Sequence, residues 1–293
     1  MDMTRNLSIV VVFYSQSGAE SFAKNNLASI EESGIETVII ENGEEKKKLL
    51  FPKNVKYIVA GENLGYGAAA NRGIDETSSE YVLLMNDDVI ITSEFLEKLI
   101  ERTEFYRENR FRIVGFRVFS EKSKRTGIHI APYSPFIILY HFSPLPNILS
   151  FFSQSNGYVG AFEGLRSKFS SKEVYGVNGS VMLLDRKFFV DVGGFDKDYF
   201  LTYEETDLFL RTMKRKGRIY YDSSINVNHM HSLTAGEESL GYSFMSMRIF
   251  LKKHYGSAAA NFVAMWIFFF LMVKRFVFFK SGGRVFEHFK KSI

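Results

Sequence analysis

The sequence predicts an α/β fold, with a mixed and mostly parallel sheet flanked by helices, and two observations support this class. The first 120 residues alternate short apolar, β-branched runs with segments of helical pattern. Strands separated by helices favour parallel pairing, with helices covering both faces of the sheet. In addition, hydrophobic residues make up 46% and charged residues 24% of the chain, as in ordinary globular proteins.

Each element is expected from its own residue pattern. Strands are expected at 8–14, 37–40, 55–59 and 81–85, and helices at 21–33, 67–77 and 93–107. Further along, the pattern predicts helices at 186–192 and 206–216, the second ended by Gly217, and a short strand at 219–221. Together they predict one α/β unit with an interruption in its middle.

The interruption begins near Ala131. Four of the five prolines lie there among apolar runs at 136–140 and 151–152. Proline at this density breaks regular elements, so an irregular apolar insertion is expected at 126–172. It is either a loop packed on its own domain or a surface that meets lipid or a lipid-linked substrate.

The C-terminal segment, 241–293, is expected to be a helical, basic and aromatic tail that associates with a membrane. It holds twelve consecutive apolar residues, Phe262–Val273, whereas a membrane span needs about 20. The last 46 residues carry nine basic side chains against the single acid Glu287. This pattern is typical of an interfacial helix on anionic lipid or of a membrane-buried hairpin arm, and a core helix of an oligomer is the alternative.

Composition excludes several kinds of site. The chain has no cysteine, which excludes disulfides, a thiolate nucleophile and Cys-ligated zinc. The apolar run at 9–14 is too short for the core of a signal peptide, so it is expected to form the first strand. The net charge of +4 is mild, and no nucleic-acid partner is expected.

The stretch that follows the strand at 81–85 carries the strongest chemical signal. Asn86, Asp87 and Asp88 come directly after this apolar run. The carboxyl ends of strands are where open α/β sheets bind ligands. Hard oxygen ligands suit Mg²⁺ or Mn²⁺, and these cations suit a substrate diphosphate. The alternative is structural, since Asn and Asp side chains also close turns.

A glycine turn lies earlier, between the strand at 55–59 and the helix at 67–77. Residues 65–70 match the dinucleotide pattern G-x-G-x-x-G/A. In a dinucleotide fold this loop normally follows the first strand, and residues 14–18 lack it, so an NAD(P)-dependent oxidoreductase is an alternative rather than the leading function. A glycine-rich turn into a helix still favours an anion, although a tight turn with alanine packing would look the same.

Acidic residues gather at the start of the helix expected at 206–216. Glu204, Glu205 and Asp207 lie beside Tyr203, and a carboxylate in such a place can act as general base on a hydroxyl. Two structural alternatives exist, a capping box between Thr202 and Glu205, and an i, i+4 ion pair from Asp207 to Arg211.

Two histidines, His229 and His231, follow the strand at 219–221. Alternation along a strand would point both to one face. They are candidates for a late metal or diphosphate ligand, although single histidines are more often structural.

Taken in order, four segments resemble the family 2 glycosyltransferases with the GT-A fold, particularly rhamnosyltransferase-like enzymes of bacterial surface polysaccharide assembly. The segments are 62–74 with its Asn-Leu-Gly turn, 83–89 with Asn-Asp-Asp, 193–196 together with 203–208, and His229. The resemblance covers residues 7 to about 255. It implies a GT-A domain at 1–240, with a nucleotide-binding half at 1–125 and an acceptor and catalytic half at 173–240.

The resemblance implies an inverting, metal-dependent transfer of a sugar, by resemblance rhamnose, from a dTDP or UDP donor to a hydroxyl of a saccharide acceptor. Such acceptors are often carried on polyprenyl diphosphate, which places the enzyme at the cytoplasmic face of the cell membrane. A noncatalytic, membrane-associated protein that binds nucleotide sugars is a further alternative.

The resemblance also implies roles for single residues. Asp88, with Asn86 and His229, would hold a divalent metal, Mn²⁺ or Mg²⁺. Glu205 would be the base, with Glu204 and Asp207 as rivals. The nucleotide sugar would be bound by Tyr14, Ser15, Glu41, Asn42, Asn63, Gly65, Asn71, Arg72, Asn86 and Asp87.

Overall fold

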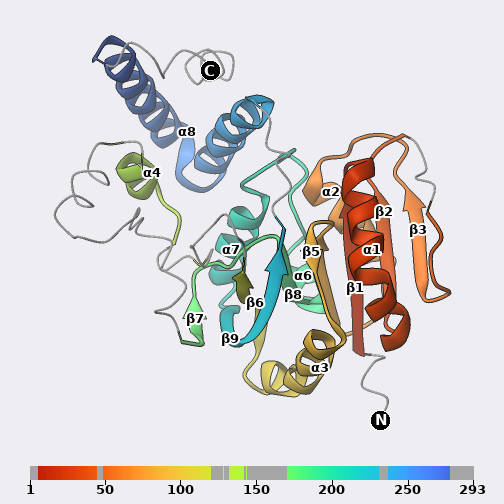
Figure 1. The fold of residues 1–293 in the computed structure, drawn as a ribbon. Coiled ribbons are helices and arrows are strands. Elements are labelled where there is room, and N and C mark those ends of the chain that lie inside the picture. The colour runs from red at the N-terminus through yellow and green to blue at the C-terminus, as the bar shows by residue number, and fades with distance from the viewer. Residues whose placement is uncertain are drawn as a thin grey trace.

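The structure is a computed structural model, and it describes residues 6–44, 49–119, 128, 132–141, 143, 170–230 and 237–277. Nine strands form one sheet in the order β3-β2-β1-β4-β8-β6-β9-β5, and β7 pairs with β9 outside this path. The strands are β1 Leu7–Phe13, β2 Glu36–Glu41, β3 Val55–Val59, β4 Tyr81–Asn86, β5 Val89–Ile90, β6 Phe111–Phe119, β7 Lys172–Val174, β8 Val181–Asp185 and β9 Arg218–His229. The predicted mixed α/β class is therefore confirmed (Figure 1).

The direction of pairing changes across the sheet. β1 pairs in parallel with β2 and β4, and β2 pairs in parallel with β3. β8 runs antiparallel to both of its neighbours, β4 and β6. Beyond it, β6 and β9 are parallel, whereas β5 and β7 are antiparallel to β9. Among the parallel strands, β1, β2 and β4 are buried apolar runs, because helices cover both of their faces.

The helices are α1 Gln16–Ser33, α2 Tyr66–Asp75, α3 Ser93–Glu108, α4 Pro135–His141, α6 Arg186–Asp191, α7 Glu204–Lys214 and α8 Glu237–Val277. Alternation along β1 separates two cores. Leu7, Ile9, Val11 and Phe13 pack with apolar residues of α1 and α3, whereas Val10 and Val12 pack with those of α2, α6 and α7. The domain is thus a three-layer α/β/α arrangement.

The strand order reverses at β1, which lies between β2 and β4. The chain leaves β1 through α1 to β2 on one side and returns through α2 to β4 on the other side. In open α/β sheets this switch point opens a crevice at the carboxyl ends of the two strands, where ligands bind. Ser15 and the pair Asp87 and Asp88 follow these two ends directly.

A third apolar cluster joins α8 and α4 to α7, beside the sheet domain (Figure 1). α8 is two helices that meet at Gly256, whose φ of 87° and ψ of 165° interrupt the helix. Among the described residues one helical stretch, Gly241–Met272, is long and apolar enough to cross a membrane by length and composition, and 22% of its most apolar window is buried. The helical tail is therefore longer than the twelve-residue apolar run suggested.

Several predicted elements differ from the structure. The insertion was expected to be irregular, yet it contains α4, which packs on α8; the rest of 126–172 lies almost wholly outside the described residues. The strand expected at 219–221 extends to His229. β6 was not predicted, because Arg112, Gly115 and Arg117 interrupt its apolar pattern; the Arg112 guanidinium pairs with Asp185 on β8.

Candidate active site

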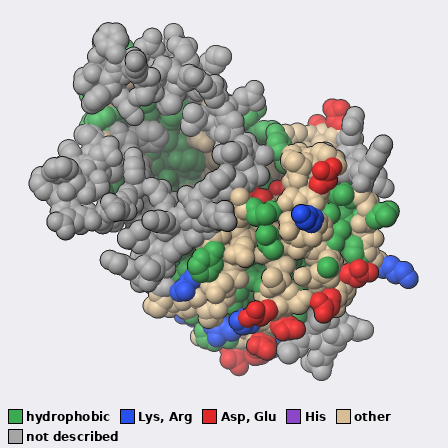
Figure 2. Space-filling model, in the orientation of Figure 1, with side chains coloured by type: hydrophobic (Ala, Val, Ile, Leu, Met, Phe, Trp, Pro, Cys, Tyr) green, Lys and Arg blue, Asp and Glu red, His purple; other side chains and the backbone are tan. Residues whose placement is uncertain are grey.

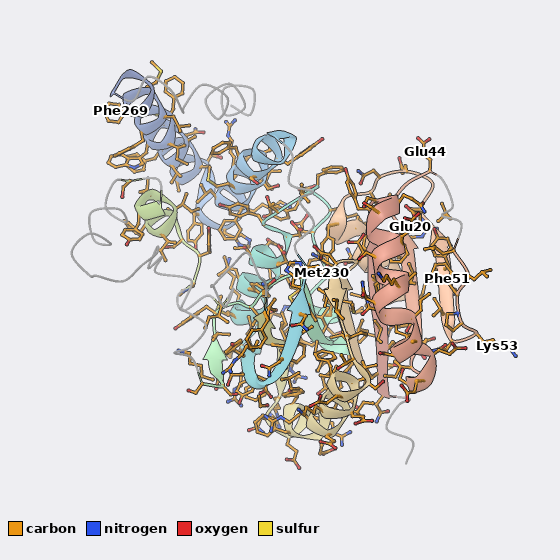
Figure 3. The ribbon with its side chains drawn as sticks, viewed as in Figure 1. Glu20, Glu44, Phe51, Lys53, Met230 and Phe269 are labelled. Atoms are coloured by element: carbon orange, nitrogen blue, oxygen red, sulfur yellow. The ribbon has the colours of Figure 1, made fainter. Side chains whose placement is uncertain are left out.

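The turn after β4 brings together two residues that are 141 positions apart in the chain. Val89 on β5 pairs antiparallel with His229 on β9, and the Met230 amide donates to the Asp88 carbonyl over 2.9 Å. This register places Nε2 of His229 2.9 Å from Oδ1 of Asp88, with both side chains largely buried. Figure 3 labels Met230 at this end of β9, beside β5. His231 lies outside the described residues.

Asp87 faces the end of β1 instead. A Cβ added to Gly18, in the first turn of α1, would lie 2.2 Å from Oδ2 of Asp87, so only glycine leaves room for this carboxylate. The Tyr14 backbone amide donates to it, and Ser15 caps α1 by accepting the Gly18 amide over 3.0 Å. Burial, and next the charge of Asp88, raise the pKa of Asp87 to about 6.

Asp88 and His229 fit a divalent cation that is shared with a substrate. Mg²⁺ in such sites is bound by one or two carboxylates together with substrate phosphates and waters, and not by an all-protein cage. The two side chains, already within hydrogen-bond distance, supply one hard oxygen and one imidazole nitrogen. Within the described ranges no group of three His, Cys, Asp or Glu side chains is placed to hold a metal. The arrangement therefore suits a cation completed by a diphosphate.

Asn86 is held by its backbone at the last position of β4, where its amide donates to the Ser180 carbonyl over 2.8 Å. Its side chain is half-buried at the crevice. Asn86 therefore lies beside Asp87 and Asp88, at a position that a metal or nucleotide ligand would need.

Two asparagines shape the turn that precedes α2. Oδ1 of Asn42 accepts the Leu64 amide over 2.8 Å, and its Nδ2 donates to Oδ1 of Asn63 over 3.1 Å. Oδ1 of Asn63 also accepts the Gly65 amide over 3.0 Å. Nearby, the Tyr57 hydroxyl donates to the buried Glu41 carboxylate over 3.0 Å. These hydrogen bonds fix the loop at the ends of β2 and β3, next to the switch point.

Gly65 joins this loop to the second half of the domain. Its φ of 80° is left-handed, and an added Cβ would lie 2.4 Å from the Phe200 carbonyl oxygen. The same carbonyl accepts the Tyr66 amide over 3.2 Å. The turn follows β3, whereas the glycine loop of a dinucleotide fold follows the first strand. In this structure Gly65 instead lets two backbone segments pack closely together.

Asn71 and Arg72 bind backbone groups of the fold. The Asn71 amide group donates to the Phe195 carbonyl over 2.8 Å and accepts the Phe195 amide over 2.9 Å. Arg72 donates to the Ala60 carbonyl over 3.1 Å. Asn71 thus ties α2 to the second half of the domain, whereas Arg72 ties α2 to the end of β3.

The acids of α7 begin at a strained turn. Thr202 and Tyr203 have φ values of 65° and 68°, and Tyr203 is the N-cap without a side-chain cap. The predicted capping box between Thr202 and Glu205 is therefore wrong, because Thr202 lies before the cap and its hydroxyl donates to Ser243 of α8 over 3.3 Å. The left-handed pair turns the chain so that Glu204 and Glu205 open the helix near the glycine turn of α2.

Glu204 and Glu205 are an acidic pair with raised pKa values. Glu204 is 3% exposed, and burial followed by the charge of Glu205 raises its pKa to about 9. Glu205 is half-buried, and burial raises its pKa as well. A Cβ added to Gly179 would lie 2.0 Å from Oε1 of Glu205, so this glycine makes room for the carboxylate.

Asp207, the third candidate base, is held by Arg211 and His254. Nε of Arg211 and Nε2 of His254 each lie 2.6 Å from its carboxylate, and the Tyr199 hydroxyl donates to it over 3.3 Å. Burial alone would raise the pKa of Asp207, but the hydrogen bond from His254 and the charge of Arg211 outweigh burial and lower it. The predicted i, i+4 ion pair is thus present, and it leaves Glu204 and Glu205 as the remaining candidates for the base.

Tyr66 connects the two acidic groups and is absent from the predicted site. Its hydroxyl oxygen is buried. Burial, followed by the charges of Glu205, Glu204, Asp87 and Asp88, raises its pKa well above the usual value. Acidic residues from the end of β4 and from the start of α7 therefore both act on this one hydroxyl group. The place of Tyr66 between Gly65 and Gly67 is the sequence signal that could have identified it. Gly18 and Gly179, which make room for Asp87 and Glu205, have no comparable sequence pattern around them.

Comparison with known proteins gives the family of the chain. The model of the family described as "Glycosyl transferase family 2" matches residues 8–166. The low-salt glycan biosynthesis hexosyltransferase Agl10 of Haloferax volcanii is 27% identical over 219 residues, which are 72% of this chain and 63% of that protein. The N-acetylglucosaminyl-diphospho-decaprenol L-rhamnosyltransferase of Mycobacterium tuberculosis is 25% identical over 252 residues, 80% of either protein.

Solved structures share the fold at low identity. Residues 1–349 of S. aureus TarS superpose with a TM-score of 0.52 at 14% identity, covering 93% of this chain and 72% of that one. GalNAc-T7, solved with UDP, GalNAc and Mn²⁺, superposes with a TM-score of 0.53 at 13% identity, covering 78% of this chain and 44% of that one. Since the family model spans more than half of its residues, the chain belongs to glycosyl transferase family 2.

Proposed function

We propose that the protein transfers a sugar, with inversion at the anomeric carbon, from a nucleoside diphosphate donor to a hydroxyl group of a saccharide acceptor. One observation carries the proposal. A metal-compatible pair, Asp88 and His229, lies at the end of β4, and an acidic pair, Glu204 and Glu205, opens α7; the charges of Asp88, Glu204 and Glu205 all act on the Tyr66 hydroxyl. A diphosphate on the first pair and an acceptor hydroxyl on the second would enclose the sugar between them.

Glu205 is the base in this proposal. Its carboxylate takes the proton of the acceptor hydroxyl while the acceptor oxygen forms a bond to the anomeric carbon. The bond from that carbon to the phosphate oxygen breaks, and its electron pair leaves with the nucleoside diphosphate. Glu204, whose pKa of about 9 keeps it protonated at neutral pH, lowers the charge around Glu205. Attack and departure on opposite faces give inversion.

Asp88 and His229, with Asn86 beside them, would hold a divalent cation, Mn²⁺ or Mg²⁺. When bound, the cation supplies charge stabilisation for the departing diphosphate. Asp87 lies between this pair and the end of β1, where it can accept from hydroxyl groups of the nucleotide ribose or of the sugar. The loop held by Asn42 and Asn63 presents its backbone to the base and ribose.

The named relatives support a proposed donor and acceptor. The mycobacterial relative is named as a rhamnosyltransferase that acts on an N-acetylglucosaminyl-diphospho-decaprenol. By analogy, this chain takes rhamnose from a dTDP donor, with UDP sugars as the second choice, and transfers it to a saccharide on a polyprenyl diphosphate. The protein would then work at the cytoplasmic face of the cell membrane.

The second half of α8 supports contact with a membrane. Phe262, Met265 and Phe269 are 57%, 70% and 60% exposed, and their spacing places them on one face of the helix. Val263, Ile267 and Leu271, on the other face, are buried in the cluster shared with α4 and α7. On the face shown in Figure 2, acidic side chains lie around α3 and also near Glu20 and Glu44, which Figure 3 labels. The apolar face of α8 is followed in the sequence by Lys274 and Arg275, and an apolar face with nearby basic residues suits an anionic lipid surface.

A direct transfer assay tests the proposed function. The purified protein is incubated with Mn²⁺, N-acetylglucosamine on a short polyprenyl diphosphate, and in turn dTDP-L-rhamnose, UDP-glucose, UDP-galactofuranose or UDP-N-acetylglucosamine. A disaccharide product is expected with one donor and is lost in Glu205→Gln. Glu97→Gln, an exposed residue of α3, is the matched control and retains activity. Product formed equally by Glu205→Gln would remove the proposed base.

A further inference from the structure

Three buried polar atoms around the acidic pair have no hydrogen-bond partner within the protein. They are the Tyr66 hydroxyl, Oγ of Ser180 and Oε2 of Glu204. More than nine in ten buried polar groups in proteins have a partner, because leaving one without a partner costs free energy. Three such atoms in one place therefore mark a surface that is completed by a ligand.

The three atoms come from three different elements that meet at the site. Tyr66 opens α2, Ser180 precedes β8 and Glu204 opens α7. A Cβ on Gly67, next to Tyr66, would lie 3.4 Å from Cβ of Glu204, which shows how closely α2 and α7 approach. Ser180 follows the glycine that contacts Glu205, and its carbonyl accepts the Asn86 amide.

We infer that Tyr66 and Ser180 bind hydroxyl groups of the transferred sugar and so help to determine which sugar the protein accepts. The inference rests on the proposed function and adds two residues to it. The charges of Asp87 and Asp88, after β4, and of Glu204 and Glu205, at the start of α7, all act on the Tyr66 hydroxyl. The sugar must lie between its diphosphate and the base. Ser180 adjoins both places, because its carbonyl accepts the Asn86 amide and its neighbour Gly179 lies against Glu205.

The chemistry of the two side chains suits a neutral, hydroxyl-rich ligand. Burial and the nearby carboxylates raise the pKa of Tyr66, so its hydroxyl stays protonated and donates. The serine hydroxyl can donate or accept, and Glu204 in its protonated form can do both as well. Four carboxylates around Tyr66 disfavour a bare phosphate there, whereas sugar hydroxyls can donate to carboxylates and accept from Tyr66.

Conservative variants test this inference without removing the rings or the backbone. Tyr66→Phe keeps the edge-to-face contact with Phe195, whose ring centroid lies 6.4 Å away, and Ser180→Ala removes a single oxygen. Thr212→Val is the matched control, because its buried hydroxyl also lacks a partner within the protein. Thr212 lies two turns further along α7, about 12 Å from Glu204.

Calorimetry measures binding of dTDP-L-rhamnose and dTDP, and of UDP-glucose and UDP, each with Mn²⁺. The comparison uses the nucleotide sugar and nucleoside diphosphate that the unmodified protein binds. Tyr66→Phe is expected to weaken binding of the nucleotide sugar about fivefold to tenfold, the value of one hydrogen bond. Ser180→Ala is expected to weaken it about threefold, the value of a weaker hydrogen bond. Both variants should bind the nucleoside diphosphate as before, and Thr212→Val should bind both ligands as before.

Equal affinities of all variants for the nucleotide sugar would overturn the inference, as would an equal loss for the sugar and the diphosphate. Either result would leave the proposed function intact if Glu205→Gln still abolishes transfer. Binding of neither pair to the unmodified protein would reject the proposed function and this inference together. Thermal unfolding distinguishes loss of a sugar contact from loss of structure. A variant with both a lower Tm and weaker diphosphate binding would also overturn the inference.

Discussion

Nε2 of His254, on α8, lies 2.6 Å from Oδ1 of Asp207, on the helix that carries Glu204 and Glu205. Both side chains are nearly inaccessible, at 7% and 1% exposure. Two further contacts tie α8 to the turn that opens α7: the Ser246 hydroxyl donates to the Leu201 carbonyl over 2.9 Å, and the Phe250 ring packs on Tyr203. The first half of α8 is therefore part of the support of the active site, and its second half carries the exposed apolar face.

We predict that His254→Ala destabilises the protein and reduces turnover. A hydrogen bond to a charged group contributes about 1.5–3 kcal/mol, which corresponds to a fall in Tm of roughly 2–5 °C for a chain of this size. Loss of support for the strained turn at Thr202 and Tyr203 should lower kcat more than it changes the KM for the donor. His254→Gln should restore part of both values, and exposed Lys252→Ala on α8 is the control. A change in Tm with unaltered kcat would confine His254 to a role in stability.

We predict that Asp88→Asn removes metal-dependent binding of the diphosphate. The substitution replaces the carboxylate with a neutral amide, a weaker ligand for a hard cation. Calorimetry with Mn²⁺ should show at least about a tenfold weaker binding of the nucleoside diphosphate, which is about 1.4 kcal/mol. His229→Gln should show a smaller loss, and the exposed Asp75→Asn none. If Asp88→Asn binds the nucleoside diphosphate as tightly as the unmodified protein does, both with Mn²⁺ and with EDTA, a metal at this position is excluded.

We predict a stability difference between Glu204→Gln and the unmodified protein that grows with pH. The pKa of Glu204 is raised from 4.5 to about 9 in the folded state. Its protonated form therefore supports stability fully below pH 4.5, and this support is lost as pH rises toward 9, by at most about 1.4 kcal/mol per pH unit. The side chain introduced in Glu204→Gln cannot ionise. The Tm of this variant minus the Tm of the unmodified protein should therefore increase from pH 5 to pH 9. A constant offset across this range would contradict the raised pKa, and Glu97→Gln controls for surface charge.

We predict that the exposed face of α8 binds anionic membranes. Met265→Glu combined with Phe269→Glu places charges on the apolar face that Figure 3 shows at Phe269, on the part of α8 furthest from the sheet. Flotation with vesicles of phosphatidylcholine and phosphatidylglycerol should show binding of the unmodified protein that is lost in this variant and weakened by salt. Met245→Glu, on the first half of α8 and 49% exposed, should still bind.

Retained vesicle binding by the double variant would contradict the membrane role of this face. If the unmodified protein instead forms a dimer in solution and the variant is monomeric, the face is an oligomer interface. Point variants are preferable to deletion of residues 256–293, because the buried face of this helix packs on α4 and its removal would expose that cluster.

The sequence predicted the parallel half of the fold well, because a strand buried on both faces is a continuous apolar run that sequence patterns detect. It predicted β6 and the second half of β9 poorly. In β9, buried Ile225, Val227 and His229 alternate with polar residues on the other face, so only its apolar start is evident from the sequence. In α4, helical structure forms within a proline-rich segment because Pro135 occupies the first helical position, where no amide hydrogen is needed.

The acids of the site could be found from the sequence, whereas their division of roles depended on distant partners. Asp88 meets His229 through the pairing of β5 with β9, and a resemblance to a known family was needed to connect them. Nothing near Asp207 in the chain indicates His254, which is 47 residues away and arrives on another helix. Tyr66 was overlooked because its turn matched a dinucleotide pattern in which the second position carries no role.

The configuration of the product tests the central claim most directly. The donor that supports transfer is incubated with Mn²⁺ and the polyprenyl-linked acceptor, and proton NMR records the anomeric coupling of the first product formed by the unmodified protein and by Glu205→Gln. The account predicts a linkage inverted relative to the donor, and at least about a thousandfold lower rate in the variant, within the range that a general base supplies. A product with retained configuration, or an inverted product formed at the same rate by Glu205→Gln, would contradict it.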